Sequence, residues 1–209
     1  MDTEEESRRI LKVAQDLFHR EGITATGVQR ISTAAGISKR TLYERFDSKD
    51  HLLELVLRGL DMQVYAGFVG QAETAGADPV ARLDALFAGA ERRAGQDGFR
   101  GCPFINFAAE IPGPAHPARE IIKAHKERMR GWIEQQLRTA DARDPIGLSR
   151  ELAVLFDGAL ATSGITGDVG PAKAARNLAA ARVREALPGG PGTSVGSPSP
   201  RRTAGSTPS

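Results

Sequence analysis

Residues 26–46 read Thr26-Gly27-Val28-Gln29-Arg30-Ile31-Ser32-Thr33-Ala34-Ala35-Gly36-Ile37-Ser38-Lys39-Arg40-Thr41-Leu42-Tyr43-Glu44-Arg45-Phe46, and this stretch decides the fold. Thr26 and Gln29 have the spacing of a capping box, which predicts the start of a short helix. Gly36 then ends that helix, because glycine accepts a positive φ at a helix C-terminus. Ser38 is a typical N-cap for a second short helix over residues 39–46. Two short helices joined by a glycine-containing turn predict a helix-turn-helix.

The apolar pattern on either side of this stretch is helical as well. Residues 4–20 place their apolar side chains on one face of a helix with 3.6 residues per turn: Ile10, Leu11, Ala14, Leu17 and Phe18. The apolar positions of the helix-turn-helix can pack on that face: Ile31, Ala35, Ile37, Leu42 and Phe46. A long helix with an apolar stripe follows Ser48. Since no segment alternates with a period of two residues, we predict an all-α protein with no sheet.

The side of the second short helix that remains outside is polar and basic. It carries Ser38, Lys39, Arg40, Thr41, Tyr43 and Arg45. Basic side chains attract DNA phosphates, and tyrosine and threonine hydroxyls can bond phosphate oxygens or base edges. The alternative is that these side chains form only the solvated face of a small helical bundle. The glycine turn, the caps and the apolar pattern together favour DNA binding.

Residues 26–53 also resemble the DNA-binding domain of the TetR family of transcriptional regulators. The resemblance is carried by Ala35-Gly36-Ile37-Ser38, Thr41-Leu42-Tyr43, Phe46, Ser48-Lys49 and Leu52. It implies a homodimeric regulator, usually a repressor, that binds a palindromic operator in double-stranded DNA. The implied domains are a DNA-binding domain at residues 4–64, with its motif at 27–46, and a helical effector-binding and dimerisation domain at 65–187.

The resemblance also implies which residues contact DNA. By position they are Thr26, Ser38, Lys39, Arg40, Thr41, Tyr43 and Lys49. Arg40 stands where the family usually has a small residue, a difference that bears on the operator sequence.

The second half of the chain reads as further helices with short breaks, as in an antiparallel bundle. The segment Gly101-Cys102-Pro103-Phe104-Ile105-Asn106 resembles a segment found in one TetR subgroup at the entry to the sixth helix. Aromatic and apolar residues with a few polar groups are typical of a pocket for a small hydrophobic effector. The candidates are Phe87, Cys102, Phe104, Asn106, Phe107, Met129, Trp132 and Phe156. The alternative is that these residues form ordinary core.

Two predicted helices near the end of this half are candidates for a dimer contact. Their candidate residues are Leu148, Leu152, Leu155, Ala159, Leu160, Leu178 and Val183. Two such helices from each subunit would form a four-helix bundle, as the resemblance also implies. The alternative is that they pack only within one chain. A two-fold dimer would present paired recognition helices about 34–36 Å apart to two half-sites.

Composition excludes several classes of protein. The chain has 209 residues, a net charge of +2, one cysteine and no apolar run near 18 residues, so we expect no membrane span. The acidic start, residues 1–6, lacks the apolar stretch of a secretory signal, so we expect a cytoplasmic protein. Cys102 has no disulfide partner, and its neighbours Phe104 and Ile105 favour burial over a redox role. The spacing of His19, His51, His116 and His125 predicts surface positions, no metal site and no cofactor.

The last 22 residues, 188–209, contain 18 Pro, Gly, Ser or Thr and are expected to be disordered. The pattern Gly192-Thr193-Ser194-Val195-Gly196 matches the serine-hydrolase elbow, but no strand precedes it and no helix follows it. With no phosphate-binding loop and no Ser/His/Asp set, an enzyme is disfavoured. The hypotheses are therefore a ligand-responsive DNA-binding repressor, a DNA-binding protein without an effector, and, least supported, a small helical enzyme.

Overall fold

The computed structural model describes residues 3–111 and 113–190, and over these residues the chain is all-helical without a strand. This confirms the all-α prediction. The elements are α1 (Thr3–Glu21), α2 (Val28–Ala35), α3 (Lys39–Arg45), α4 (Lys49–Tyr65), the π-helical turn η1 (Ala66–Gly70), α5 (Gln71–Glu73), α6 (Pro79–Ala94), α7 (Pro103–Glu110), α8 (Pro117–Thr139), α9 (Pro145–Thr166) and α10 (Gly170–Ala186). Most of the expected disordered tail, with the pattern at 192–196, lies outside the described residues. None of the helices described is both long enough and apolar enough to cross a bilayer.

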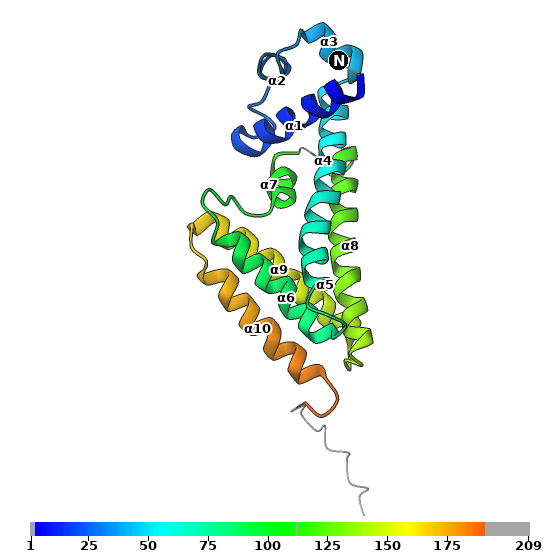
Figure 1. Ribbon diagram of the computed structural model, residues 1–209, viewed down its shortest axis with the longest axis vertical. Helices are drawn as coiled ribbons and strands as arrows, with labels where there is room; N and C mark the ends of the chain where they lie inside the picture. The colour runs from blue at the N-terminus through cyan, green and yellow to red at the C-terminus, as the bar shows by residue number, and fades with distance from the viewer. Residues whose placement is uncertain (1–2, 112, 191–209) are drawn as a thin grey trace, which may run out of the picture.

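The helices form two groups joined by α4 (Figure 1). The short bundle α1–α3 occupies one end of the molecule, and α6, α9 and α10 occupy the other. Helices α4 and α8 run side by side along the length of the molecule, and they contact each other. The short α7 lies between α1 and the second group, so it connects the two ends.

The helix-turn-helix forms through local backbone chemistry. Gly36 ends α2 with φ +64°, and Ile37 N–H donates to the Ser32 carbonyl at 3.0 Å. Ser38 caps α3, since its Oγ accepts from Thr41 N–H at 2.9 Å. Both of these features confirm the sequence prediction.

The predicted capping box at the start of α2 is wrong. The N-cap is Gly27, and no side chain caps this helix. Thr26 is fully buried, and its hydroxyl donates to the Gly22 carbonyl at 2.7 Å. The Gln29 amide donates instead to the Thr33 hydroxyl one turn later. The threonine side chain therefore holds the turn between α1 and α2 in place of capping the helix.

The small bundle is held by a buried apolar core and by ties to α1. Phe18, Ile31 and Leu42 are at most 1% exposed and belong to one core cluster. Burying one such side chain contributes roughly 1.5–3 kcal/mol. Around this core, Arg9 of α1 donates to the Ala35 carbonyl at 2.7 Å, which fixes the end of α2. The orientation of α3 is thus set mainly by what lies beneath it, and its outer side remains open.

Candidate functional site

The open side of α3 presents basic and aromatic groups to solvent. Lys39, Arg40 and Tyr43 are exposed, and Tyr43 is 51% exposed although it is a large aromatic residue. Arg40 Nε pairs with Glu44 Oε1 at 2.9 Å, an exposed pair of the kind that contributes little stability. Its guanidinium can therefore exchange that carboxylate for a phosphate. Thr41 is half-buried, with its hydroxyl oxygen 2.9 Å from Ser38 Oγ.

Three residues of the predicted DNA-contact surface are buried or are held by contacts within the chain. Thr26 is buried, as described above, so its hydroxyl is not on the surface. Lys49 Nζ donates to the Ile23 carbonyl at 2.6 Å, which ties α4 to the α1–α2 turn. Arg45, expected on the outer side, is half-buried and pairs with Glu6 of α1 at 2.9 Å. Of the predicted set, the exposed side chains are Ser38, Lys39, Arg40 and Tyr43.

A second candidate site is a cavity of about 210 Å³ that α4, α8 and α9 enclose together with η1. Its apolar lining includes Val64, Phe68, Met129, Ile133, Phe156 and Leu160. The Phe156 ring packs edge-on against Phe68 at 5.1 Å and against Phe87 at 5.7 Å, which makes one wall rigid. A cavity of this kind suits an apolar ligand.

The polar edge of this cavity is a cluster around Lys126. Its Nζ lies 2.5 Å from Asp157 Oδ1 and 3.5 Å from Cys102 Sγ. Cys102 is 3% exposed, which confirms the predicted burial. Sequence reasoning missed Lys126 and Asp157, since they lie 31 residues apart and no short motif joins them.

His125 is 3% exposed, so the expectation that the histidines lie on the surface is wrong for this one. Its ring stacks on Phe104 with 3.8 Å between centroids, and its Nδ1 lies 2.6 Å from Asp61 Oδ1. Burial lowers the pKa of His125, although the hydrogen bond to Asp61 acts in the opposite direction. The neutral imidazole can thus fasten α8 to α4. Among the described residues, no three His, Cys, Asp or Glu side chains converge on a metal position.

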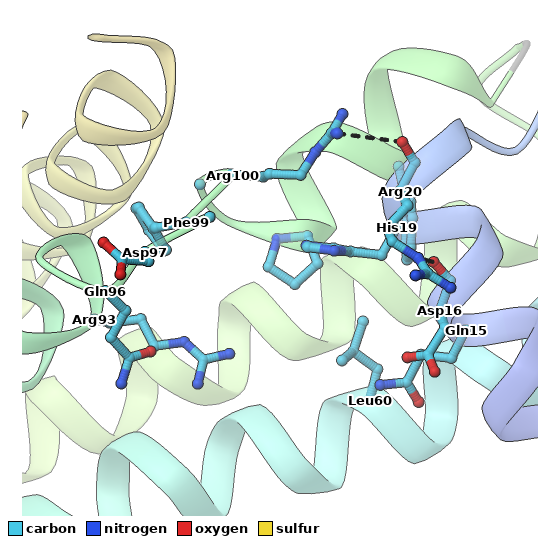
Figure 2. Close-up of a pocket in the computed structure, with 14 residues that line it drawn as sticks. Gln15, Asp16, His19, Arg20, Leu60, Arg93, Gln96, Asp97, Phe99 and Arg100 are labelled. Atoms are coloured by element: carbon cyan, nitrogen blue, oxygen red, sulfur yellow. Dashed lines mark hydrogen bonds between the residues drawn. The ribbon is translucent and has the colours of Figure 1, made fainter. Parts of the chain in front are cut away.

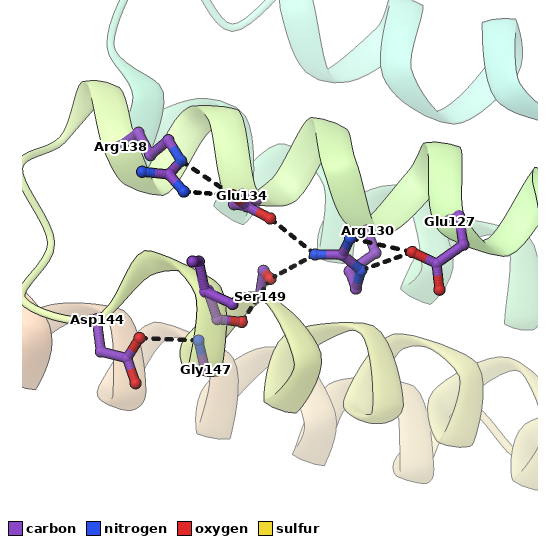
Figure 3. A network of polar contacts seen from close by, with 8 residues as sticks. Glu127, Arg130, Glu134, Arg138, Asp144, Gly147 and Ser149 are labelled. Carbon is purple, nitrogen blue, oxygen red and sulfur yellow. Dashed lines mark hydrogen bonds and ion pairs between the residues drawn. The ribbon is translucent and has the colours of Figure 1, made fainter.

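One rim of the cavity is held by the network in Figure 3. Arg130 of α8 pairs with Glu127 and Glu134 and also donates to Ser149 Oγ of α9 at 3.3 Å. Asp144 caps α9 by accepting from Gly147 N–H at 2.9 Å. The Arg130–Ser149 hydrogen bond ties α8 to α9 beside the cavity, and the other contacts hold the two side chains and the helix start in place.

The predicted effector residues do not share one pocket. Cys102, Met129 and Phe156 line the cavity of about 210 Å³. Phe87 lines a separate cavity of about 310 Å³ between α6 and α10. The other four lie elsewhere: Phe104 stacks on His125, Phe107 faces the α1 side, Trp132 directs its Nε1 at Glu73, and Asn106 is exposed and donates to the Arg100 carbonyl. Most of the set serves the core, because a helical domain of this size needs its aromatic residues inside.

The predicted dimer residues also need correction. Five of them are buried within the chain: Leu148, Leu152, Ala159, Leu160 and Val183. Leu155 is half-buried, and Leu178 is 51% exposed. Helix α9 is apolar on several sides. The apolar pattern from which we predicted the dimer contact is the side of α9 that packs inside the chain. The large apolar side chains open to a partner on these two helices include Val154 and Ile165, which are 72% and 84% exposed.

Comparison with known proteins agrees with this architecture. Residues 10–56 match the family described as bacterial regulatory proteins, tetR family, and residues 79–179 match a tetracyclin repressor-like C-terminal domain. A TetR-type transcriptional regulator of Streptomyces avermitilis is 31% identical, with a TM-score of 0.74 over 83% of this chain and 97% of that one. This chain belongs to the TetR family. A TetR-family regulator of Streptomyces coelicolor is 29% identical, with a TM-score of 0.80 over 87% of this chain and 96% of that one.

Curated relatives of this TetR-family regulator are named transcriptional repressors. The HTH-type transcriptional repressor KstR2 of Rhodococcus jostii is 38% identical over 77 residues, which is 37% of either chain. KstR2 of Mycobacterium tuberculosis is 35% identical over 83 residues, or 39% of this chain and 41% of that one. The matches span well under half of these repressors. The family matches alone show that the chain is a TetR-family transcriptional regulator with a DNA-binding domain.

Proposed function

We propose that this regulator is a ligand-responsive repressor that acts in the cytoplasm and binds a palindromic operator as a homodimer. The observation that carries the proposal is the exposed side of α3, where the side chains of Lys39, Arg40 and Tyr43 are open to solvent above a buried core. The repressor names of the curated relatives support repression. We further propose that the protein acts without catalysing a reaction and without a cofactor.

DNA contact from α3 follows from the chemistry of its open side. Lys39 and Arg40 supply attraction to phosphates that does not depend on sequence. Tyr43 and Thr41 supply groups that fix the register of the helix on the duplex. Lys49 keeps ammonium donors beyond its bond to the Ile23 carbonyl, so a phosphate contact there is compatible with its structural bond.

Tyr43→Ala is expected to weaken operator binding roughly 10- to 100-fold, because it removes both the ring and the hydroxyl from the contact surface. The side chain is 51% exposed, so the free energy of unfolding should change little. The operator is first selected from genomic DNA fragments, and affinity is then measured by fluorescence anisotropy at fixed salt. Met62→Ala, at a 66% exposed position of α4, is the matched control and should bind as the native protein does. Native affinity in Tyr43→Ala would remove α3 as the contact surface.

Dimerisation is supported by the apolar face that α9 and α10 leave open. Val154, Ile165 and Leu178 are all more than half exposed. Val154, Leu155 and Leu178 line a shallow groove whose rims carry Arg150, Glu151 and Arg182. Exposed apolar side chains with charged residues of both signs at the rim suit a self-complementary two-fold contact.

Effector response is supported by the route from the cavity to the DNA-binding bundle. Cys102 lines the cavity and is also the N-cap of α7. At the other end of α7, the Glu110 carboxylate accepts from Thr24 N–H at 3.0 Å. Just before α7, Arg100 donates to the Arg20 carbonyl at 3.2 Å. A ligand that displaces α7 would therefore move the contacts that position α1, and it shifts operator binding only by its different affinity for the two arrangements.

Ala153→Phe is expected to abolish the effector response while leaving operator affinity unchanged, because the added ring fills the cavity from α9. Ala153 is half-buried and lines the cavity, so a phenyl group has room to enter. The measurement is a titration of apolar compounds with the melting temperature and operator release as readouts. Native protein should respond to some compounds, and Ala153→Phe should not. A native protein that binds operator but responds to no apolar compound would favour the alternative, a DNA-binding protein without an effector.

A further inference from the structure

An open cleft of about 450 Å³ separates α1 from the α6–α7 connection, residues 95–102. Figure 2 shows Gln15, Asp16, His19 and Arg20 of α1 on one side and Arg93, Gln96, Asp97 and Phe99 on the other, with Arg100 close to α1. Leu60 of α4 lies beneath them. This cleft does not share a lining residue with the cavity that Cys102 and Phe156 line. Because it lies between the DNA-binding bundle and the second group of helices, anything bound there touches both.

Three guanidinium groups, those of Arg20, Arg93 and Arg100, line the cleft, and none of them forms an ion pair within the part of the chain that the structure describes, although the charge of Arg20 acts on the neighbouring Glu21. Arg100 donates to the Arg20 carbonyl, Arg20 donates to the Asp16 carbonyl, and Arg93 has no ion pair among the residues that the structure describes. Two carboxylates, those of Asp16 and Asp97, also line the cleft. Neither comes within ion-pair distance of the three guanidinium groups. The arginines therefore keep free N–H donors directed at solvent in a concave site.

Near His19, which lines the cleft from α1, the arginine charges act more strongly than the charge of Asp16. Burial lowers the pKa of His19, and Arg100 and Arg93 lower it further, whereas Asp16 opposes them more weakly. Among the charges that act on this ring, the two guanidinium groups thus outweigh the Asp16 carboxylate. A guanidinium also offers paired donors whose geometry matches a carboxylate or a phosphate.

The floor of the cleft is apolar. Leu60 and Phe107 are buried, and Phe99 and Pro103 are half-buried beside them. Free inorganic phosphate would leave this surface wet, whereas an anion with an attached ring or short chain would cover it. The volume also falls in the range of small-molecule sites, about 300–1,000 Å³.

We propose that this cleft binds a small organic anion, a carboxylate or phosphate joined to an apolar body, and that the bound anion bridges α1 to residues 95–102. Arg93 and Arg100 hold the anionic group from the second set of helices, and Arg20 holds it from the DNA-binding bundle. The bridge adds charge-assisted hydrogen bonds between α1 and residues 95–102, which the hydrogen bond from Arg100 to the Arg20 carbonyl already joins. This site is distinct from the apolar effector cavity and does not depend on it.

The test is a calorimetric titration of the full-length protein without DNA, at low ionic strength because exposed charges are screened by salt. The probes are phenyl phosphate and benzoate, which separate the two anionic groups, and phenol, their uncharged counterpart. We expect saturable binding of at least one anion at one site per chain, and none of phenol. Arg93→Gln should weaken that binding about fivefold or more. Arg92→Gln is the matched control, since this neighbouring exposed arginine binds Gln71 and lies outside the cleft.

Several results would overturn the proposal. One is that neither anion binds; another is that phenol binds as well as the anions do. A third is that Arg93→Gln and Arg100→Gln both retain native affinity while Lys39→Gln loses it, because the probe then sits on the DNA-binding surface. Arg93 and Arg100 are exposed, so both variants should fold, and urea unfolding checks this. Since the titration uses no DNA, it can succeed or fail independently of the proposed operator binding.

Discussion

Gly164→Ala is expected to lower the free energy of unfolding by about 3 kcal/mol, the upper part of the usual range for an overpacked contact. A Cβ at this position of α9 would lie 2.3 Å from Gly101 N and 2.5 Å from Gly101 Cα. Both are backbone atoms, so no side-chain rotation can relieve the overlap. The segment before α7 or the helix itself would have to move. Chemical denaturation with urea measures the change.

A second glycine provides a control of opposite sign. Gly131 lies inside α8, and a Cβ there would meet no heavy atom within 4 Å apart from the neighbouring backbone of its own helix. Gly131→Ala should stabilise the protein by up to about 1 kcal/mol, because alanine is the better helix former. The same substitution in two helices thus has opposite effects. Equal effects of the two variants would show that α9 and residues 100–101 are not in the close contact described.

The Gly164 variant also has a functional consequence. The overlap falls on the backbone of Arg100 and Gly101, and the Arg100 side chain contacts α1 at the Arg20 carbonyl. Operator affinity measured well below the melting temperature should therefore fall along with stability. Gly131→Ala, which leaves this segment in place, should retain native affinity.

The helix-turn-helix could be predicted from sequence because its determinants are local. Gly36 and Ser38 act within three residues of where they stand, and the structure confirms both. The predicted cap at Thr26 is wrong because the capping-box spacing is short and degenerate. The tertiary fold instead buries this threonine against the α1–α2 turn.

The second half of the chain was predictable as helices but not as surfaces. Helix α9 has apolar residues on several sides, and the sequence alone does not say which side faces inward. Leu152 is fully buried, whereas Val154, two residues on, is 72% exposed. The cleft lined by arginines could not be predicted from the sequence either, because its residues are far apart along the chain. Arg20 and Arg100 are 80 residues apart, and only the packing of α1 beside residues 95–102 brings them together.

Leu178→Arg is expected to convert the protein to a monomer and to weaken binding to the full palindrome roughly 10²- to 10⁴-fold, through loss of the second linked contact. Leu178 lies in the α9–α10 groove and is 51% exposed, so a lone chain tolerates arginine there. A two-fold interface repeats each residue, so the dimer would have to bury two unpaired guanidinium groups. Sedimentation equilibrium measures the association, and anisotropy measures affinity for the palindrome.

Binding to a single operator half-site distinguishes loss of dimerisation from damage to the DNA-binding surface. Because α3 is untouched, Leu178→Arg should bind a single half-site as tightly as a native subunit does, while gaining nothing from the second half-site. Met62→Arg introduces the same charge at an exposed apolar residue of α4, away from α9 and α10, and should remain dimeric with native operator affinity. A Leu178→Arg protein that stays dimeric and binds the palindrome normally would place the interface elsewhere. A different interface would then have to hold the two recognition helices about 34–36 Å apart.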